Sequence, residues 1–177
     1  MTHFVLSAVG RDRPGIVAGI AEALLVAQGN IEDSQMSILR GHFAVMLIVA
    51  VPDSVDREQL ARRLEPVRDR LGLEALAIDE VDEVDPARPQ ASHVITVYGS
   101  DHPGIVHAVS AALAELEVNI TDLQTRLTGA GDEALYLLLM EVALGDADPA
   151  RVQSELDAVS SDARVEIGMR PLDAEAL

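Results

Sequence analysis

One short pattern in this chain has the residue types to bind a small anion, and it occurs twice. The first copy, residues 10–15, reads Gly-Arg-Asp-Arg-Pro-Gly, and the second, residues 99–104, reads Gly-Ser-Asp-His-Pro-Gly. In both, an apolar run ends at the first glycine and an amphipathic segment follows the Pro-Gly pair, which predicts a strand, a tight loop and a helix start. The backbone N–H groups at such a helix start can hold a carboxylate.

Each residue type in the loop has an expected role. The first glycine allows a turn with positive φ, and the proline suits the first helical turn, where its missing N–H costs nothing. Asp12 and Asp101 stand near the positive ends of the new helices and are expected to cap them. The alternative that stays open is that these aspartates only start helices and bind no ligand.

The composition excludes several kinds of chemistry. The 177 residues include no Lys and no Cys, which removes Schiff-base lysines, thiol nucleophiles and thiolate metal sites. The net charge of −17 repels phosphate backbones and anionic membranes, so we expect no direct nucleic-acid partner and no membrane partner. The first strand starts almost at Met1 with no signal peptide, and the longest apolar run, residues 43–51, is too short to cross a bilayer. A cytoplasmic protein is therefore expected.

Hydrophobic periodicity predicts the elements of the first half. Apolar residues recur every three to four positions in the two helices, and Gly29 and Gly72 are expected to stop them. The turn is expected at Gly41-His42, and the second helix cap within residues 52–54. The expected order is strand 4–9, a helix from Pro14, strands 30–40 and 43–51, a helix through Leu60 and Leu71, and strand 73–81.

The second half repeats this order. Between Val5 and Gln35, 13 of 31 positions are identical 89 residues later, which indicates an internal duplication. The expected elements are strand 94–98, a helix from Ile105 to Leu116, strands 119–128 and 135–143 around a turn at 129–132, a helix after Asp148-Pro149, and strand 164–170. The expected domains are residues 3–82 and 92–171, with an acidic, proline-containing linker at 83–91 and a tail at 172–177.

A βαββαβ unit with this loop after its first strand, and Asn-Ile at the start of its second, resembles an ACT domain. Two units in tandem resemble the glycine cleavage system transcriptional repressor family and its stand-alone ACT relatives. The resemblance implies an α+β fold of two ferredoxin-like domains, each an antiparallel sheet with helices on one face. It also implies a regulatory protein that binds an amino acid, of the glycine or serine class, and needs no cofactor.

The resemblance places the ligand where the loop of one domain faces the edge of another. The loop backbone would hold the carboxylate, and the Asn carboxamide would bind the carboxylate or the ammonium group. The two loops differ at their variable positions, so the two sites are not expected to be equivalent. The expected ligand-binding residues are Gly10, Asp12, Arg13, Gly15, Asn30, Ile31, Gly99, Asp101, His102, Gly104, Asn119 and Ile120.

The alternatives rest on other features. Residues 43–51 and 135–140 are apolar on both faces, so we expect both sheet faces to be covered, most simply in a homodimer. A ligand-free assembly module is the main alternative to an amino-acid sensor that signals through a regulator protein. The five histidines and the sequence motifs form no metal-binding or catalytic pattern, so no metal site and no enzyme activity are expected.

Overall fold

The computed structural model describes residues 1–81, 90–129 and 134–172. The chain divides into two compact units, Met1–Pro86 and Ala87–Leu177, called here the first and the second unit. Most of the expected linker at 83–91, the tail beyond Leu172 and most of the expected turn at 129–132 lie outside the described residues. The domain bounds 3–82 and 92–171 therefore stay predictions.

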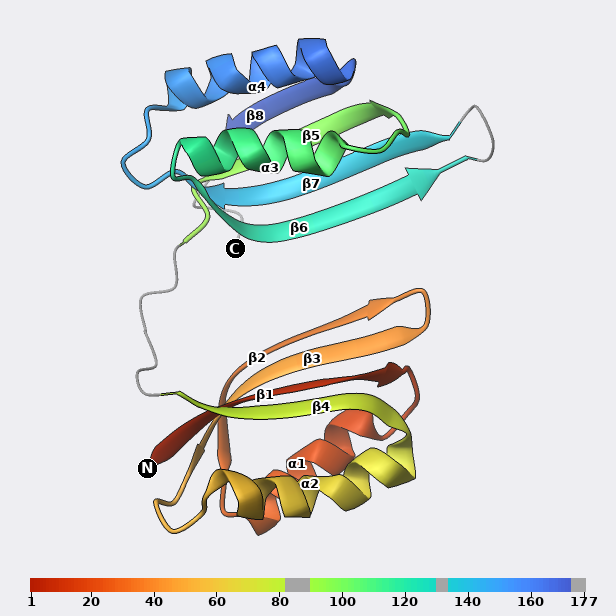
Figure 1. The fold of residues 1–177 in the computed structure, drawn as a ribbon, viewed down its shortest axis with the longest axis vertical. Coiled ribbons are helices and arrows are strands. Elements are labelled where there is room, and N and C mark those ends of the chain that lie inside the picture. Colours follow the sequence, from red (N-terminus) through yellow and green to blue (C-terminus); the bar gives the residue numbers. More distant parts are fainter. Residues whose placement is uncertain (82–89, 130–133, 173–177) are drawn as a thin grey trace. The chain divides into compact units, whose positions relative to one another are not determined.

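The first unit has the expected βαββαβ order (Figure 1). Its antiparallel sheet has the strand order β2-β3-β1-β4, and both helices lie on one face of the sheet. The elements are β1 (Thr2–Arg11), α1 (Ile16–Val26), β2 (Asn30–Leu39), β3 (His42–Val51), α2 (Arg57–Leu71) and β4 (Leu73–Val81).

The second unit repeats this topology with the strand order β6-β7-β5-β8. Its helices also cover one face of the sheet (Figure 1). The two ferredoxin-like units confirm the fold expected from the duplication. The elements are β5 (His93–Ser100), α3 (Ile105–Glu115), β6 (Asn119–Thr128), β7 (Leu135–Ala143), α4 (Pro149–Ala163) and β8 (Glu166–Pro171).

Aliphatic side chains between the helices and the sheet form the core of each unit. In the first unit Ile20 of α1 and Leu64 of α2 pack with Leu47 of β3, and all three are at most 6% exposed. In the second unit Val109, Leu156 and Met140 take the same positions. Because the chain is 2% aromatic, branched aliphatic residues fill nearly all of this space.

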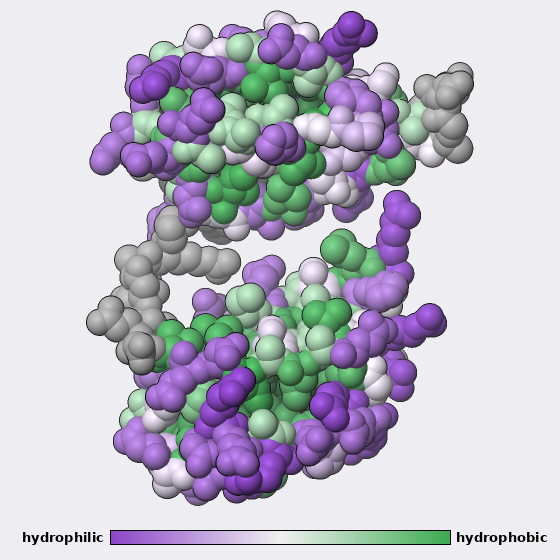
Figure 2. All heavy atoms as spheres, viewed as in Figure 1, coloured by the Kyte–Doolittle hydropathy of each residue, from purple (hydrophilic) through white to green (hydrophobic). Residues whose placement is uncertain are grey.

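Buried and exposed side chains alternate along β3 more than its apolar sequence suggests. Val45, Leu47 and Val49 face the helices and are buried, whereas Met46, between them on the opposite face, is 55% exposed. All ten residues of the edge strand β2 are exposed. Apolar residues reach the surface of both units in Figure 2. The expected covering of the open sheet faces by another unit or subunit stays a prediction.

Several element ends differ from the sequence prediction. Arg40 and Gly41, both with positive φ, form the β2–β3 turn, so His42 already belongs to β3. Gln28, with φ 57°, is the left-handed residue after α1, where Gly29 was expected to stop the helix. The side chain of Asp56 caps α2 by accepting a hydrogen bond from the Gln59 N–H over 2.7 Å, so the cap does not lie within residues 52–54.

Two other predicted helix ends are confirmed. Gly72 ends α2 in the left-handed conformation, with φ 65°. The Asp148 side chain caps α4 through the Ala150 N–H at 3.1 Å, with a proline at the start of the helix. Among the described residues, no helix is long and apolar enough to cross a membrane.

Candidate ligand site

The two loops of the repeated pattern begin their helices in the same unusual way. Gly15 precedes α1 with φ 97°, and Gly104 precedes α3 with φ 104°. A β-carbon added to either glycine would meet nothing within 4 Å, so the left-handed backbone alone favours glycine there. Pro14 and Pro103 lie in the turn before the helix, not in its first turn as predicted.

The predicted capping role of Asp12 and Asp101 is wrong, because no side chain caps α1 or α3 in the described part of the chain. The aspartates instead bind through their backbone: the Asp12 N–H donates to the Gly41 carbonyl over 2.9 Å, and the Asp101 N–H to the Ala134 carbonyl over 3.3 Å. These bonds tie each loop to the end of the neighbouring hairpin. Both carboxylates remain exposed and available to a ligand.

The starts of α1 and α3 can therefore accept an anion. The first helical bonds run from the Gly19 N–H to Gly15 and from the Ala108 N–H to Gly104, each 2.9 Å long. The N–H groups of residues 16–18 and 105–107 come before these bonds, at the positive ends of the helix dipoles. With no side-chain cap among the described residues, these groups suit a carboxylate.

The sequence predicted that the first glycine of each loop turns the chain with positive φ, and this prediction is wrong. Gly10 and Gly99 are within β1 and β5, and neither has positive φ. A β-carbon on Gly10 would lie 3.1 Å from the Leu73 Cα, and one on Gly99 would lie 2.8 Å from Cγ1 of Val165. Close packing against Leu73, the first residue of β4, and against Val165, the residue directly before β8, explains the two glycines.

Arg13 and His102 hold corresponding loop positions, and both pack against the end of the second helix of their unit. His102 Nε2 donates to the Ala163 carbonyl over 2.8 Å, in the last turn of α4. A β-carbon built on Gly72, which ends α2, would lie 3.2 Å from Nη2 of Arg13. Cationic or donor groups are favourable at the negative end of a helix. The His102 hydrogen bond therefore holds the loop of the second unit to α4, and Arg13 lies at the corresponding place beside α2.

Asn30 and Asn119 lie far from the loop of their own unit. Asn30 pairs with Ala50, which pairs in turn with His3 at the start of β1, whereas the loop follows Arg11 at the end of β1. At about 3.3 Å per residue, these two ends of the sheet are about 26 Å apart. One unit therefore cannot bring its own loop and its own Asn to one small ligand.

The Asn-Ile pairs begin the edge strands. Both asparagines are exposed, and Ile31 is 38% exposed, whereas Ile120 packs against the second core. In each unit the residue after Asn-Ile, Glu32 or Thr121, sits at a β-bulge. The Asn carboxamides are thus open to a partner at the end of the sheet opposite the loop.

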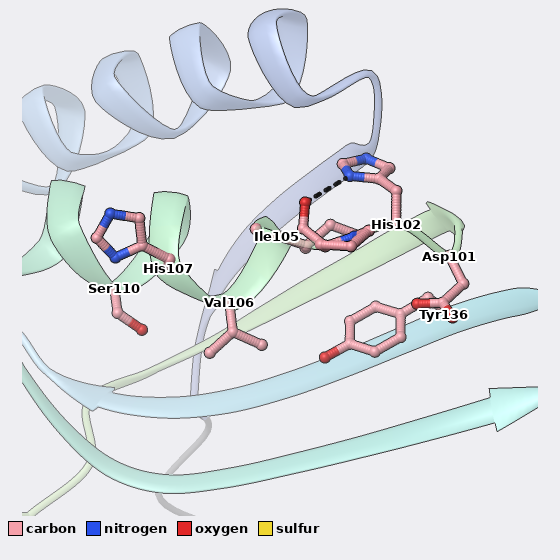
Figure 3. Close-up of a pocket in the computed structure, with 9 residues that line it drawn as sticks. Asp101, His102, Ile105, Val106, His107, Ser110 and Tyr136 are labelled. Atoms are coloured by element: carbon pink, nitrogen blue, oxygen red, sulfur yellow. Dashed lines mark hydrogen bonds between the residues drawn. The ribbon is translucent and has the colours of Figure 1, made fainter.

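A hollow beside the loop of the second unit adds residues that the pattern did not reveal. Its volume is about 640 Å³, and Asp101, His107, Ser110 and Tyr136 line it together with the loop (Figure 3). His107 and Ser110 come from α3 and Tyr136 from β7. The loop motif alone could not predict Tyr136, because this residue comes from a strand more than thirty positions further along the chain.

Comparison with known proteins identifies the repeated unit. A family model described as the ACT domain matches residues 2–77 and, again, residues 92–170. The chain belongs to the ACT-domain family. Its two matches cover the two βαββαβ units, so the resemblance carried by the loop and Asn-Ile is confirmed.

Individual ACT relatives match one unit or both. A UPF0237 protein of Methanopyrus kandleri is 36% identical over 81 residues, which is 45% of this chain and 90% of the relative. The glycine cleavage system transcriptional repressor of Escherichia coli is 24% identical over 164 residues, 90% of this chain and 85% of the relative. A crystal structure of a Galdieria sulphuraria protein superposes with a TM-score of 0.77 and 28% identity, covering 97% of this chain and 99% of that one.

Proposed function

We propose that this tandem ACT protein senses a small amino acid, of the glycine or serine class, and passes the signal on by protein–protein contact. The observation that carries the proposal is the repeated placement of two complementary parts at opposite ends of each unit. One part is an uncapped helix start beside an exposed aspartate, and the other is an exposed asparagine.

The chemistry of the two parts matches an α-amino acid. The first-turn N–H groups of α1 or α3 would hold the carboxylate, and Asp12 or Asp101 would attract the ammonium group. Since about 26 Å separates the loop from the Asn within one unit, the Asn would come from a different ACT unit. The ligand would then stabilise the contact between two units, which couples binding to assembly.

The partners follow from this mode of binding. A homodimer supplies further ACT units, and a regulator protein that recognises the ligand-bound assembly would receive the signal. The net charge of −17 disfavours direct contact with nucleic acid or an anionic membrane. We place the protein in the cytoplasm and assign it no enzyme activity.

The second candidate function is a ligand-free assembly module. The exposure of all ten residues of β2 favours it, because a long unpaired edge strand is a template for pairing with another chain. In this alternative the loops would only start helices, and Asn30 and Asn119 would only begin strands.

A thermal-shift screen of the full chain against the twenty amino acids separates the two candidates. A ligand at one hundred times its dissociation constant adds about 2.7 kcal/mol to the free energy of unfolding. We expect glycine, serine or a close analogue to raise the melting temperature. If none of the twenty raises it at millimolar concentration, the sensor function is wrong and the assembly module is favoured.

A further inference from the structure

Three of the differences between the two ACT units lie at the hollow beside the loop of the second unit. The repeat offset of 89 pairs Ala18 with His107 and Ala21 with Ser110. The strand register adds a third pair: Gly10 lies opposite Phe43, and its counterpart Gly99 lies opposite Tyr136. Three apolar side chains of the first unit are thus replaced by three hydrogen-bonding side chains in the second.

These three polar residues share the hollow of about 640 Å³ beside the β5–α3 loop. Figure 3 shows His107 and Ser110 next to each other on α3, and the Val106 side chain lies between this pair and Tyr136. The hydrogen bond drawn there belongs to His102 and not to the three wall residues. Phe43, the counterpart of Tyr136, is only 2% exposed, whereas Tyr136 is partly exposed at the hollow.

The chemistry of the wall selects one kind of group. The Tyr136 and Ser110 hydroxyls both donate and accept, and a neutral His107 imidazole offers one donor and one acceptor. The Asp101 carboxylate in the same hollow disfavours a second acidic group on the ligand, besides the α-carboxylate held at the helix start. The volume lies within the range of small-molecule sites. An uncharged group that both donates and accepts, such as a hydroxyl, suits this wall.

We propose that the second unit holds the discriminating site, where His107, Ser110 and Tyr136 select a small hydroxyl-bearing amino acid over its apolar analogue. This inference rests on the proposed amino-acid function. A ligand hydroxyl that pairs with one of these groups adds a hydrogen bond that the apolar analogue cannot make. The first unit has Ala18 and Ala21 at the corresponding positions, and these side chains offer no hydrogen bond to a ligand hydroxyl.

The test is calorimetric titration of the full chain with L-serine and with L-alanine, which differ by one hydroxyl. The triple variant His107→Ala/Ser110→Ala/Tyr136→Phe gives the second unit the wall of the first. We expect the parent protein to prefer serine by about tenfold, and the triple variant to retain a preference of no more than about twofold. Tyr98→Phe, a partly exposed tyrosine of β5 outside the hollow, is the matched control and should leave the preference unchanged.

The outcomes separate this inference from the function on which it rests. If amino acids bind but the parent protein does not prefer serine, or the triple variant keeps the preference, the inference is wrong and the sensor function stands. If no amino acid binds the parent protein, both are wrong. Should the triple variant fail to fold, Tyr136→Phe, which loses a single oxygen atom, decides the matter: an unchanged preference would overturn the inference.

Discussion

A β-carbon on Gly99 would lie 2.8 Å from Cγ1 of Val165, a contact that β-carbons do not tolerate. The Val165 Cα would be only 3.3 Å away, so the side chain cannot relieve the contact by rotating. Likewise, a β-carbon added to Gly10 would lie 3.1 Å from the Cα of Leu73. The first glycine of the repeated motif therefore serves the packing between the end of one strand and the start of another.

Gly99→Ala tests this packing. Overpacking at a close backbone approach costs about 1–3 kcal/mol, so we expect the free energy of unfolding in urea to fall by that amount. Gly168→Ala is the matched control, because its nearest neighbour, Oγ1 of Thr96, lies 3.4 Å from the added carbon. Equal effects of the two substitutions would show that the approach to Val165 is not the reason for the glycine.

His102→Ala removes the hydrogen bond from the β5–α3 loop to the Ala163 carbonyl. One such bond contributes about 0.5–1.5 kcal/mol, so a loss of that size in the free energy of unfolding is expected without any ligand. His107→Ala, in the same hollow but exposed, is the control and should change stability by less than about 0.5 kcal/mol. A stability that is unchanged in His102→Ala would contradict the anchoring role.

Asp56→Ala removes the cap of α2. The lost bond to the Gln59 N–H is expected to cost about 1 kcal/mol of unfolding free energy, and Asp56→Asn should restore most of it, because Asn caps nearly as well. Ser54→Ala, in the segment where the sequence suggested a cap, should be neutral. A larger loss from Ser54→Ala than from Asp56→Ala would place the cap where the sequence suggested it.

Light scattering at micromolar concentration tests the expected homodimer. A mass twice that of one chain is expected, and a mass of one chain would contradict it. Ile38→Lys adds a charge to the edge strand β2, where Ile38 is 50% exposed, and should shift the mass toward the monomer if that edge pairs. Leu25→Lys, at a 74% exposed position on α1, is the control and should leave the mass unchanged.

Local signals predicted most of the fold. Strand and helix periodicity gave the order of the twelve elements in the part of the chain that the structure describes. Gly72 and Asp148-Pro149 marked helix ends correctly because their conformational preferences act locally. The role of Gly10 was missed because the obstacle, Leu73, lies more than sixty residues away. Asp12 looked like a helix cap, but a left-handed Gly15 intervenes and moves the start of α1 beyond its reach.

The candidate site was only half predictable. The duplication singled out the loops and Asn30 and Asn119, but only the register shows that they lie at opposite ends of each sheet. The sequence comparison could not show that Phe43 and Tyr136 are equivalent. The β6–β7 connection is longer than the β2–β3 turn, so the offset of 89 no longer holds beyond it. Polar contacts between distant strands depend on such register, which the loop motif does not encode.

Calorimetric titration of the Asn30→Ala/Asn119→Ala variant with the amino acid that stabilises the parent protein tests the central claim most directly. Losing a hydrogen bond to a charged ligand group costs about 1.5–3 kcal/mol, so affinity should fall roughly ten- to a hundredfold. Because both asparagines are exposed, the melting temperature without ligand should stay near that of the parent, and the corresponding Gly substitutions should not rescue binding. Unchanged affinity in the double variant would contradict a ligand role for Asn-Ile, and with it the binding of an amino acid between ACT units.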